Sequence, residues 1–241
     1  MIKNLLLFFI CCFSIFNAQI LDEYPKNQDF YEGGVEQFYK EAHDFLLKNN
    51  ISECSHTEIY QPRIIVTKES EIKMIKDGDE ESIQNNKCTY DISLLLLKNL
   101  KGWKPAEVKG QKFGAITEFI VYSKDLQSNY KTGYNPNRFI ISAQYPKGND
   151  EFNKDFHDNF MSLFHDYHIN GNVNLEFYIN KSGKIVNARF FPAVMDQDFN
   201  KDFMRALNRM KKVWKPALYS NIPIKQRISF PVNFSIRFIE R

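Results

Sequence analysis

The sequence predicts an α+β fold made of two tandem small domains, each with two helices packed on one face of a three-stranded antiparallel sheet. The first observation behind this prediction is an internal repeat, because residues 212–217 (Lys-Val-Trp-Lys-Pro-Ala) match residues 101–106 (Lys-Gly-Trp-Lys-Pro-Ala). Residues upstream match at one constant offset: Tyr31, Gly34, Phe38, Lys40, His43 and Asp44 correspond to Tyr145, Gly148, Phe152, Lys154, His157 and Asp158. The second observation is the order of apolar patterns in the later copy, which reads helix, strand, strand, helix, strand. Each copy spans roughly 100 residues, the size of one small domain.

The elements of the later copy follow one another with clear boundaries. Phenylalanines recur at helical spacing from Phe152 to Phe164, after an acidic first turn. Residues 173–179 alternate as a half-buried strand, residues 180–183 (Asn-Lys-Ser-Gly) make a hairpin turn, and residues 184–191 form the return strand. A second helix opens at Asp198 and cannot continue through Pro216. The most regular alternation of the chain, residues 228–238, predicts the last strand.

The sequence divides into a leader, two copies and a connection. Residues 1–18 read as a signal peptide, residues 19–125 as the first copy, residues 126–140 as a linker and residues 141–241 as the second copy. In the first copy, Glu69-Ser70-Glu71 stands where the second copy has its glycine turn, which leaves the geometry of that turn open.

The leader predicts export. Lys3 precedes an apolar run from Leu5 to Phe16, and cleavage is expected after Ala18. An apolar run of this length is short for a membrane span, which needs roughly twenty residues. The alternative is an uncleaved N-terminal anchor, because Phe16 is a poor residue three positions before the cut.

Cleavage would leave two cysteines, Cys54 and Cys88, in an oxidising compartment. We therefore expect a disulfide between them, which would restrain the unfolded chain by roughly 3–4 kcal/mol. No metal site is expected. His165 and His168 are three residues apart, but no cysteine or carboxylate pattern completes a ligand set around them.

Composition and motifs argue against several function classes. The chain is 43% hydrophobic and 25% charged, and its net charge of +3 is too small to predict binding to nucleic acid or to an anionic membrane. There is no nucleophile elbow, no His-Glu-x-x-His, no phosphate-binding loop and no dinucleotide fingerprint. The acidic run at residues 77–82 lacks the ligand spacing of a calcium loop and reads as a solvated loop. We therefore expect that the protein is not an enzyme and binds no cofactor.

The second copy resembles the TonB C-terminal domain family. The resemblance rests on Tyr-Pro-x-Gly before a helix, an Asn-Lys-Ser-Gly-Lys-Ile hairpin, Trp-Lys-Pro-Ala, and a strand with Pro-Val-Asn-Phe, in this order within residues 145–238. The first copy is a degenerate relative. The motif residues are Tyr145, Pro146, Gly148, Trp214, Lys215 and Pro216, with Trp103, Lys104 and Pro105 in the first copy.

The resemblance implies a small periplasmic module that adds a segment of an outer-membrane receptor to its sheet. The chain lacks the proline-rich spacer of the energy-transducing member. The first hypothesis is therefore a periplasmic binding or adaptor protein for an envelope partner, with peptidoglycan as another ligand to consider. The second is a short energy-transducing protein, held in the inner membrane by its uncleaved leader. A third is a hydrolase with a dispersed site.

The candidate partner-binding residues lie on the last strand and in the tryptophan motif: Ile228, Phe230, Pro231, Val232, Phe234, Trp214 and Lys215. Proline within a strand is confined to edges and bulges, so Pro231 predicts an edge strand that can accept a partner strand. The other interpretation is that Pro231, Arg227 and Arg237 block such pairing. Trp214 would either cover the end of the core, which we favour, or stand exposed as a platform for sugars or a peptide.

Overall fold

The structure is a computed structural model that describes residues 20–76, 80–168, 171–191, 193–210 and 213–234. The predicted leader and residues 235–238 of the predicted last strand lie outside the described residues. The chain forms two compact units, Met1–Tyr134 (unit 1) and Asn135–Arg241 (unit 2). Both mix helices and strands, as the sequence predicts. No helix among the described residues has the length and apolarity needed to cross a bilayer.

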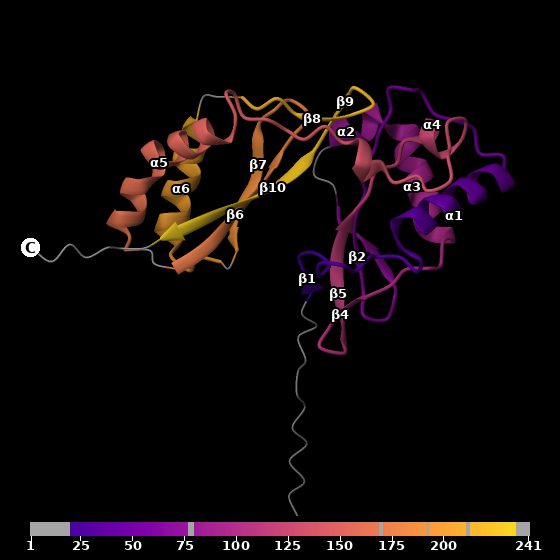
Figure 1. The fold of residues 1–241 in the computed structure, drawn as a ribbon, viewed down its shortest axis with the longest axis horizontal. Helices are drawn as coiled ribbons and strands as arrows, with labels where there is room; N and C mark the ends of the chain where they lie inside the picture. Colours follow the sequence, from indigo (N-terminus) through magenta and orange to yellow (C-terminus); the bar gives the residue numbers. More distant parts are fainter. Residues whose placement is uncertain (1–19, 77–79, 169–170, 192, 211–212, 235–241) are drawn as a thin grey trace, which may run out of the picture. The chain divides into compact units, whose positions relative to one another are not determined.

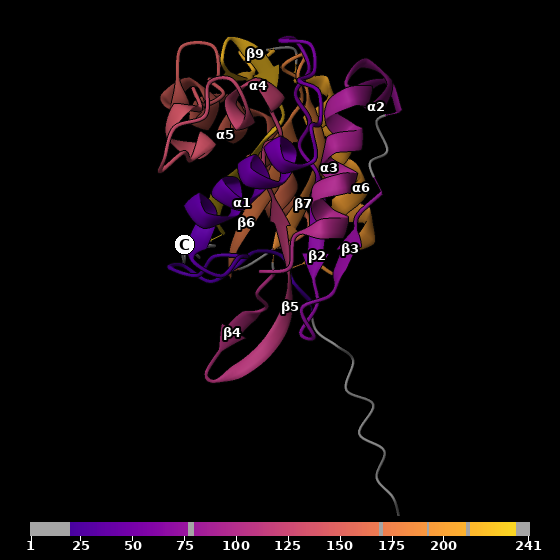
Figure 2. The same cartoon turned by 90° about the vertical axis from the view of Figure 1, so that its right-hand side faces the viewer.

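Unit 1 contains the helices α1 (Gly34–Lys48), α2 (Glu80–Asn85), α3 (Lys87–Asn99) and α4 (Ser123–Leu126). Its strands are β1 (Ile20–Leu21), β2 (Arg63–Val66), β3 (Ile72–Met74), β4 (Ala106–Val108) and β5 (Gln111–Glu118). The sheet order is β1-β5-β2-β3, with β4 also paired to β5. Figure 2 shows α1 and α3 in front of these strands.

Three features of unit 1 differ from the sequence prediction. The sheet has five strands instead of three, and β1 is parallel to β5 whereas the other pairs are antiparallel. The acidic run expected to be a loop contributes residues 80–82 to α2, while residues 77–79 lie outside the described residues. The region predicted as a linker is also partly structured, since Tyr130 and Tyr134 pack in the core of unit 1.

Unit 2 contains the 3-10 helix η1 (Pro136–Phe139), α5 (Asn149–Asp166) and α6 (Gln197–Arg209). Its main sheet has the antiparallel order β10-β6-β7, formed by β6 (Gly171–Ile179), β7 (Ile185–Phe191) and β10 (Gln226–Phe234). Figure 1 shows α5 and α6 side by side along one face of this sheet. The structure adds a hairpin that the sequence did not predict, β8 (Ala217–Tyr219) with β9 (Ile222–Ile224).

Helix α6 of unit 2 begins at a side-chain cap. α6 starts at Gln197 because the Asp196 side chain accepts a hydrogen bond of 2.9 Å from the Phe199 amide. Its apolar face then buries Phe199, Phe203 and Leu207 in the core. This face is what attaches the helix to the sheet, because burying one such side chain stabilises the fold by roughly 1.5–3 kcal/mol.

The two units repeat the same contacts at matching positions. In unit 1, Tyr31, Phe38 and Trp103 form a ring cluster with centroids 5.3–5.5 Å apart. In unit 2, Tyr145, Phe152 and Trp214 do the same at 5.1–5.2 Å. The main chain repeats as well: the Lys104 amide donates to Phe30 at 2.9 Å, and the Lys215 amide donates to Gln144 at 2.8 Å. The matched tyrosine, phenylalanine and tryptophan of the sequence repeat therefore occupy matching places in the two cores.

Candidate functional site

The last strand of unit 2, β10, is an edge strand. It pairs with β6 on one side, and the sheet order β10-β6-β7 includes no strand on its other side among the described residues. Ile228, Phe230 and Val232 pack toward the core, whereas Ser229 and Pro231 are exposed. These three apolar candidates are therefore used by the fold, whereas the side chain of the fourth, Phe234, lies outside the described part of the structure. A partner added to the edge would meet the main chain of β10 and the side chains on its exposed face.

The contacts of unit 1 indicate which main-chain groups of β10 point toward β6 and which point toward the outer edge. Val121 and Tyr60 exchange both main-chain hydrogen bonds, at 2.8 and 3.0 Å, and the repeat aligns this pair with Val232 and Val173, which are paired in the sheet. Neighbouring residues of a strand face opposite sides, so the nitrogen of Pro231 faces the outer edge. Ser229 and Asn233 share this direction. The outer edge of β10 thus offers amide donors at Ser229 and Asn233, with one donor missing at Pro231.

A buried carboxylate joins the three strands on the face opposite the helices. The Glu176 side chain on β6 is 8% exposed, and it accepts hydrogen bonds from Arg189 on β7 at 2.8 and 3.0 Å and from Arg227 on β10 at 2.6 Å. Charge-assisted bonds of this kind are stronger than neutral ones. Arg227, which the sequence offered as a residue that blocks pairing, therefore also holds β10 onto the sheet.

The tryptophan motif is structural. Trp103 and Trp214 are 4% and 5% exposed, and both rings lie in the core clusters of their units. The proposal that Trp214 binds a partner is therefore wrong, because a buried ring cannot serve as a surface platform. The Trp103 indole donates to the Leu100 carbonyl at 2.9 Å. Lys215 is exposed, but its main chain bonds to Gln144.

The remaining motif residues shape the chain around this cluster. The Tyr145 hydroxyl donates to Asp155 at 2.6 Å, as the Tyr31 hydroxyl donates to Glu41 at 2.5 Å. Burial, together with these carboxylates, raises the pKa of Tyr145 and raises the pKa of Tyr31 to about 12. Gly148 has a φ of 90°, which favours glycine. Pro105 is buried and directs the chain toward β4, while Pro146 and Pro216 are half-buried.

The predicted disulfide is present. Cys54 and Cys88 are bonded with their Cα atoms 5.7 Å apart, which ties the segment before β2 to the start of α3. The repeat aligns these positions with Tyr167 and Phe199 of unit 2, whose rings are in contact at 5.7 Å. Glu58 lies beside the disulfide and accepts from the Cys88 amide at 2.9 Å. These three residues are the one group of potential metal ligands found among the described residues, and the disulfide uses both sulfurs.

The histidines are dispersed. The His43 ring stacks on Tyr130 with centroids 3.9 Å apart, and its Nδ1 lies 2.8 Å from the Leu126 carbonyl oxygen, so this residue packs α1 against the end of unit 1. His157, its counterpart in the repeat, is exposed on α5, with Nδ1 3.5 Å from Asp158. The histidine at this shared position therefore packs against other residues in unit 1 and is exposed to solvent in unit 2.

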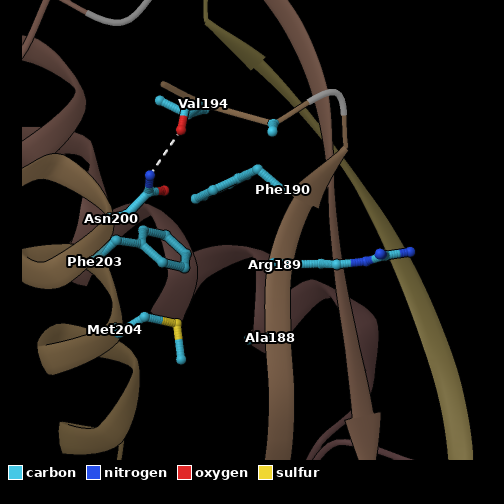
Figure 3. A pocket seen from close by; sticks show the side chains of 8 residues that line it. Ala188, Arg189, Phe190, Val194, Asn200, Phe203 and Met204 are labelled. Atoms are coloured by element: carbon cyan, nitrogen blue, oxygen red, sulfur yellow. Dashed lines mark hydrogen bonds between the residues drawn. The ribbon is translucent and has the colours of Figure 1, made fainter. Parts of the chain in front are cut away.

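An open apolar pocket of about 240 Å³ lies between β7 and α6. Its walls include Phe190, Phe203 and Met204, and the Asn200 amide inside it donates to the Val194 carbonyl at 2.7 Å (Figure 3). Arg189 points away from the pocket in Figure 3, toward its bond with Glu176. None of the residues lining this pocket supplies a nucleophile or a general base, so its walls carry no catalytic constellation.

Comparison of the chain with protein-family models, with curated proteins and with solved structures found no significant match. The fold and the candidate site are therefore interpreted from the residues and their contacts.

Sequence reasoning missed two features of the matching edge in unit 1. One is β1, a two-residue strand that lies directly after the expected cleavage site and gives almost no periodic signal. The other is the Tyr39 hydroxyl, which donates to the Ile120 carbonyl at 2.9 Å and accepts from the Ile120 amide at 3.2 Å. The alternation of the sequence indicates which residues form the strands, but it carries no information about which distant side chain closes an edge.

Proposed function

We propose that this chain is a non-catalytic periplasmic binding or adaptor protein, which engages an envelope partner by β-strand addition to the outer edge of β10. Its two units are two copies of one TonB C-terminal-like domain, and each contains two long helices and a set of antiparallel strands. The partner class that the family resemblance suggests is an extended segment of an outer-membrane receptor, and peptidoglycan is the other envelope ligand to test.

The proposal rests on a comparison of two sheet edges that the repeat aligns: the outer edge of β10 in unit 2 and the outer edge of β5 in unit 1. β10 is an edge strand whose outer amides at Ser229 and Asn233 face away from β6. On the matching edge of unit 1, β5 already pairs with a short parallel strand, β1. An edge of this fold that seats a strand in one copy supports the same mode of binding in the other. Main-chain bonds give such complexes their affinity, and neighbouring side chains give selectivity.

Two further observations support the domain assignment. The resemblance motifs of unit 2 lie together, since Tyr145 contacts Trp214, and Gly183 accepts a 3.0 Å hydrogen bond from the Trp214 amide. The equivalent ring and main-chain contacts recur in unit 1. The location in the periplasm is supported by the leader in the sequence and by the disulfide between Cys54 and Cys88.

The experiment is a binding panel with matched variants of Ser229. The mature protein is titrated with N-terminal peptides of outer-membrane receptors and with peptidoglycan fragments. Ser229→Pro removes one outward amide, whereas Ser229→Ala keeps it. For a peptide that binds by strand addition we expect Ser229→Pro to weaken binding about tenfold, the effect of one lost main-chain bond and the steric conflict of the ring. Equal affinity for both variants would exclude β10 as the acceptor.

The alternative is an energy-transducing protein anchored by its leader. The N-terminus of the mature protein distinguishes the two hypotheses. N-terminal sequencing of the exported protein should give Gln19 for the adaptor. A start at Met1 in the membrane fraction would instead favour the anchored form.

A further inference from the structure

The residues that follow the expected cleavage site lie along unit 1 as an extended strap. We use this name for residues 20–28. Ile20 and Leu21 form β1, which pairs in parallel with Gly114 and Ala115 of β5. Since the sheet order is β1-β5-β2, the strap occupies the edge of β5 that faces away from β2.

Two side chains of the strap bind main-chain groups farther along unit 1. The Tyr24 hydroxyl donates to the Lys104 carbonyl at 2.7 Å. The Gln28 side-chain amide donates to the Glu107 carbonyl at 2.7 Å and accepts from the Glu107 amide at 2.8 Å. Gln28 therefore makes both hydrogen bonds that a neighbouring strand would make with Glu107. The strap is held as a bound peptide is held, mainly through the main chain of its acceptor.

The same edge is closed beyond the strap. Ile120 faces outward, because its neighbour Val121 bonds to Tyr60, and both main-chain groups of Ile120 are taken by the Tyr39 hydroxyl. The repeat places Ile120 opposite Pro231 of unit 2, where a donor is missing instead. Tyr39 is fully buried with Ile120, so water does not compete for these bonds.

In unit 2 the matching segment is held differently: Ile141 and Leu218 exchange main-chain hydrogen bonds of 2.9 and 2.8 Å, and the Ala143 amide donates to the Gln226 side chain at 2.7 Å. No strand pairs with the outer edge of β10 among the described residues. The position that matches Ala115 is Gln226, since these two residues pair with the last residues of β2 and β6, Val66 and Ile179. The first residues of unit 2 form η1 instead of a strand, with the Asn135 side chain accepting from the Asn137 amide at 3.0 Å. One edge is thus filled by the chain itself, while the matching edge has no such strand.

We propose that the outer edge of β5 is a second peptide-acceptor site, closed in cis by the strap, which takes an extended peptide in the same parallel direction when the strap is removed. This goes beyond the proposed function, which places the partner on β10. The strap sequence, Ile-Leu-Asp-Glu-Tyr-Pro-Lys-Asn-Gln, defines the chemistry of the occupant: an apolar pair that extends the sheet, followed by a hydroxyl and an amide that bind main-chain groups.

The test is complementation in trans. A chain that begins at Asp29 is prepared with its disulfide formed, and a labelled synthetic peptide of residues 19–28 is the probe. We expect saturable binding to the truncated chain, and binding at least tenfold weaker to the chain that begins at Gln19. A peptide carrying Tyr24→Phe and Gln28→Ala should bind at least tenfold more weakly than the native peptide. Ser229→Pro in the truncated chain should leave binding unchanged, which separates this site from β10.

A folded truncated chain that binds no peptide, or equal binding by both chains, would overturn the proposal. Because removal of the strap could prevent folding, a second measurement uses the full mature chain. Tyr24→Phe with Gln28→Ala should accelerate amide hydrogen exchange of the β5 segment around Gly114 and Ala115 at least tenfold. The control is Lys26→Ala, at an exposed strap position, which should not change exchange. Unchanged exchange in the double variant would also reject the strap as the closing element.

Discussion

The turn between the first two antiparallel strands of each unit offers a reciprocal test of the repeat. In unit 2, the Gly183 amide donates to Asn180 at 2.9 Å, and the Asn180 amide donates to Lys184 at 3.0 Å. In unit 1, Ser70 and Thr67 make the matching bonds at 2.9 and 2.8 Å. The φ angles are 79° at Gly183 and 66° at Ser70, so both turns use the left-handed region. We therefore expect opposite outcomes for Gly183→Ala and Ser70→Gly.

The magnitudes follow from the local geometry. A Cβ at Gly183 would lie 2.0 Å from the Trp214 carbonyl oxygen, so the backbone must shift. The left-handed conformation costs a non-glycine residue about 1–2 kcal/mol. Displacing the chain also weakens the bond from the Trp214 amide to Gly183, worth about 1 kcal/mol. Gly183→Ala should thus destabilise unit 2 by about 3 kcal/mol. Ser70→Gly relieves strain but adds about 0.5–1 kcal/mol of chain entropy, which leaves a stabilisation of about 0.5 kcal/mol.

The assay is thermal unfolding followed by circular dichroism and calorimetry. For a domain of this size, 1 kcal/mol shifts the Tm by about 4–8 °C, so Gly183→Ala should lower the Tm of unit 2 by more than about 10 °C. Ser70→Gly should raise the Tm of unit 1 by a few degrees. An unchanged Tm in Gly183→Ala, or a clearly lower Tm in Ser70→Gly, would refute the assignment of equivalent left-handed turns.

Three further predictions concern buried groups. Tyr39→Phe should destabilise unit 1 by about 1–3 kcal/mol in urea, because both main-chain groups of Ile120 lose their partner. Burial raises the pKa of Tyr39 above its ordinary value of 10, so the folded state holds this proton more tightly than the unfolded state. The free energy of unfolding should therefore fall as the pH rises above about 10, and it should fall less steeply in the Tyr39→Phe variant. Glu176→Gln should cost unit 2 roughly 3 kcal/mol, because the arginine partners keep their charges and lose the carboxylate; a change below 1 kcal/mol would exclude a role in joining the strands. Reduction of the disulfide should lower the free energy of unfolding of unit 1 by about 4 kcal/mol and leave unit 2 unchanged, as two resolved calorimetric transitions would show.

The sequence predicted the elements of unit 2 well because its alternation is regular. β6, β7 and α5 match their predicted ranges closely, and the turn at Gly183 has the expected positive φ. The edge position of β10 followed from one residue, Pro231, since a proline in a central strand would break the ladder. The disulfide followed from counting the cysteines that remain after the predicted leader is removed.

Other features depend on contacts between distant residues and leave little trace in local patterns. The doubtful turn of unit 1 is retained because Ser70 accepts the left-handed conformation, a tolerance that propensity alone does not predict. β1 is too short for periodicity to detect, and its parallel pairing needs β5 as a template. The sequence favoured a core position for Trp214 but left a surface position open, and the rings of Tyr145 and Phe152 packed around it show that it lies in the core.

The central claim is that the matching edges of the two units differ, one closed by the chain and one open to a partner. Amide hydrogen exchange of the free mature protein, resolved by residue, tests this directly by comparing Ile120 with Ser229. The Ile120 amide, bonded to Tyr39 and buried, should exchange slowly, whereas the outward amide of Ser229 should exchange rapidly until a partner peptide is added. Slow exchange at Ser229 in the free protein, or rapid exchange unchanged by a bound peptide, would contradict an open acceptor edge on β10.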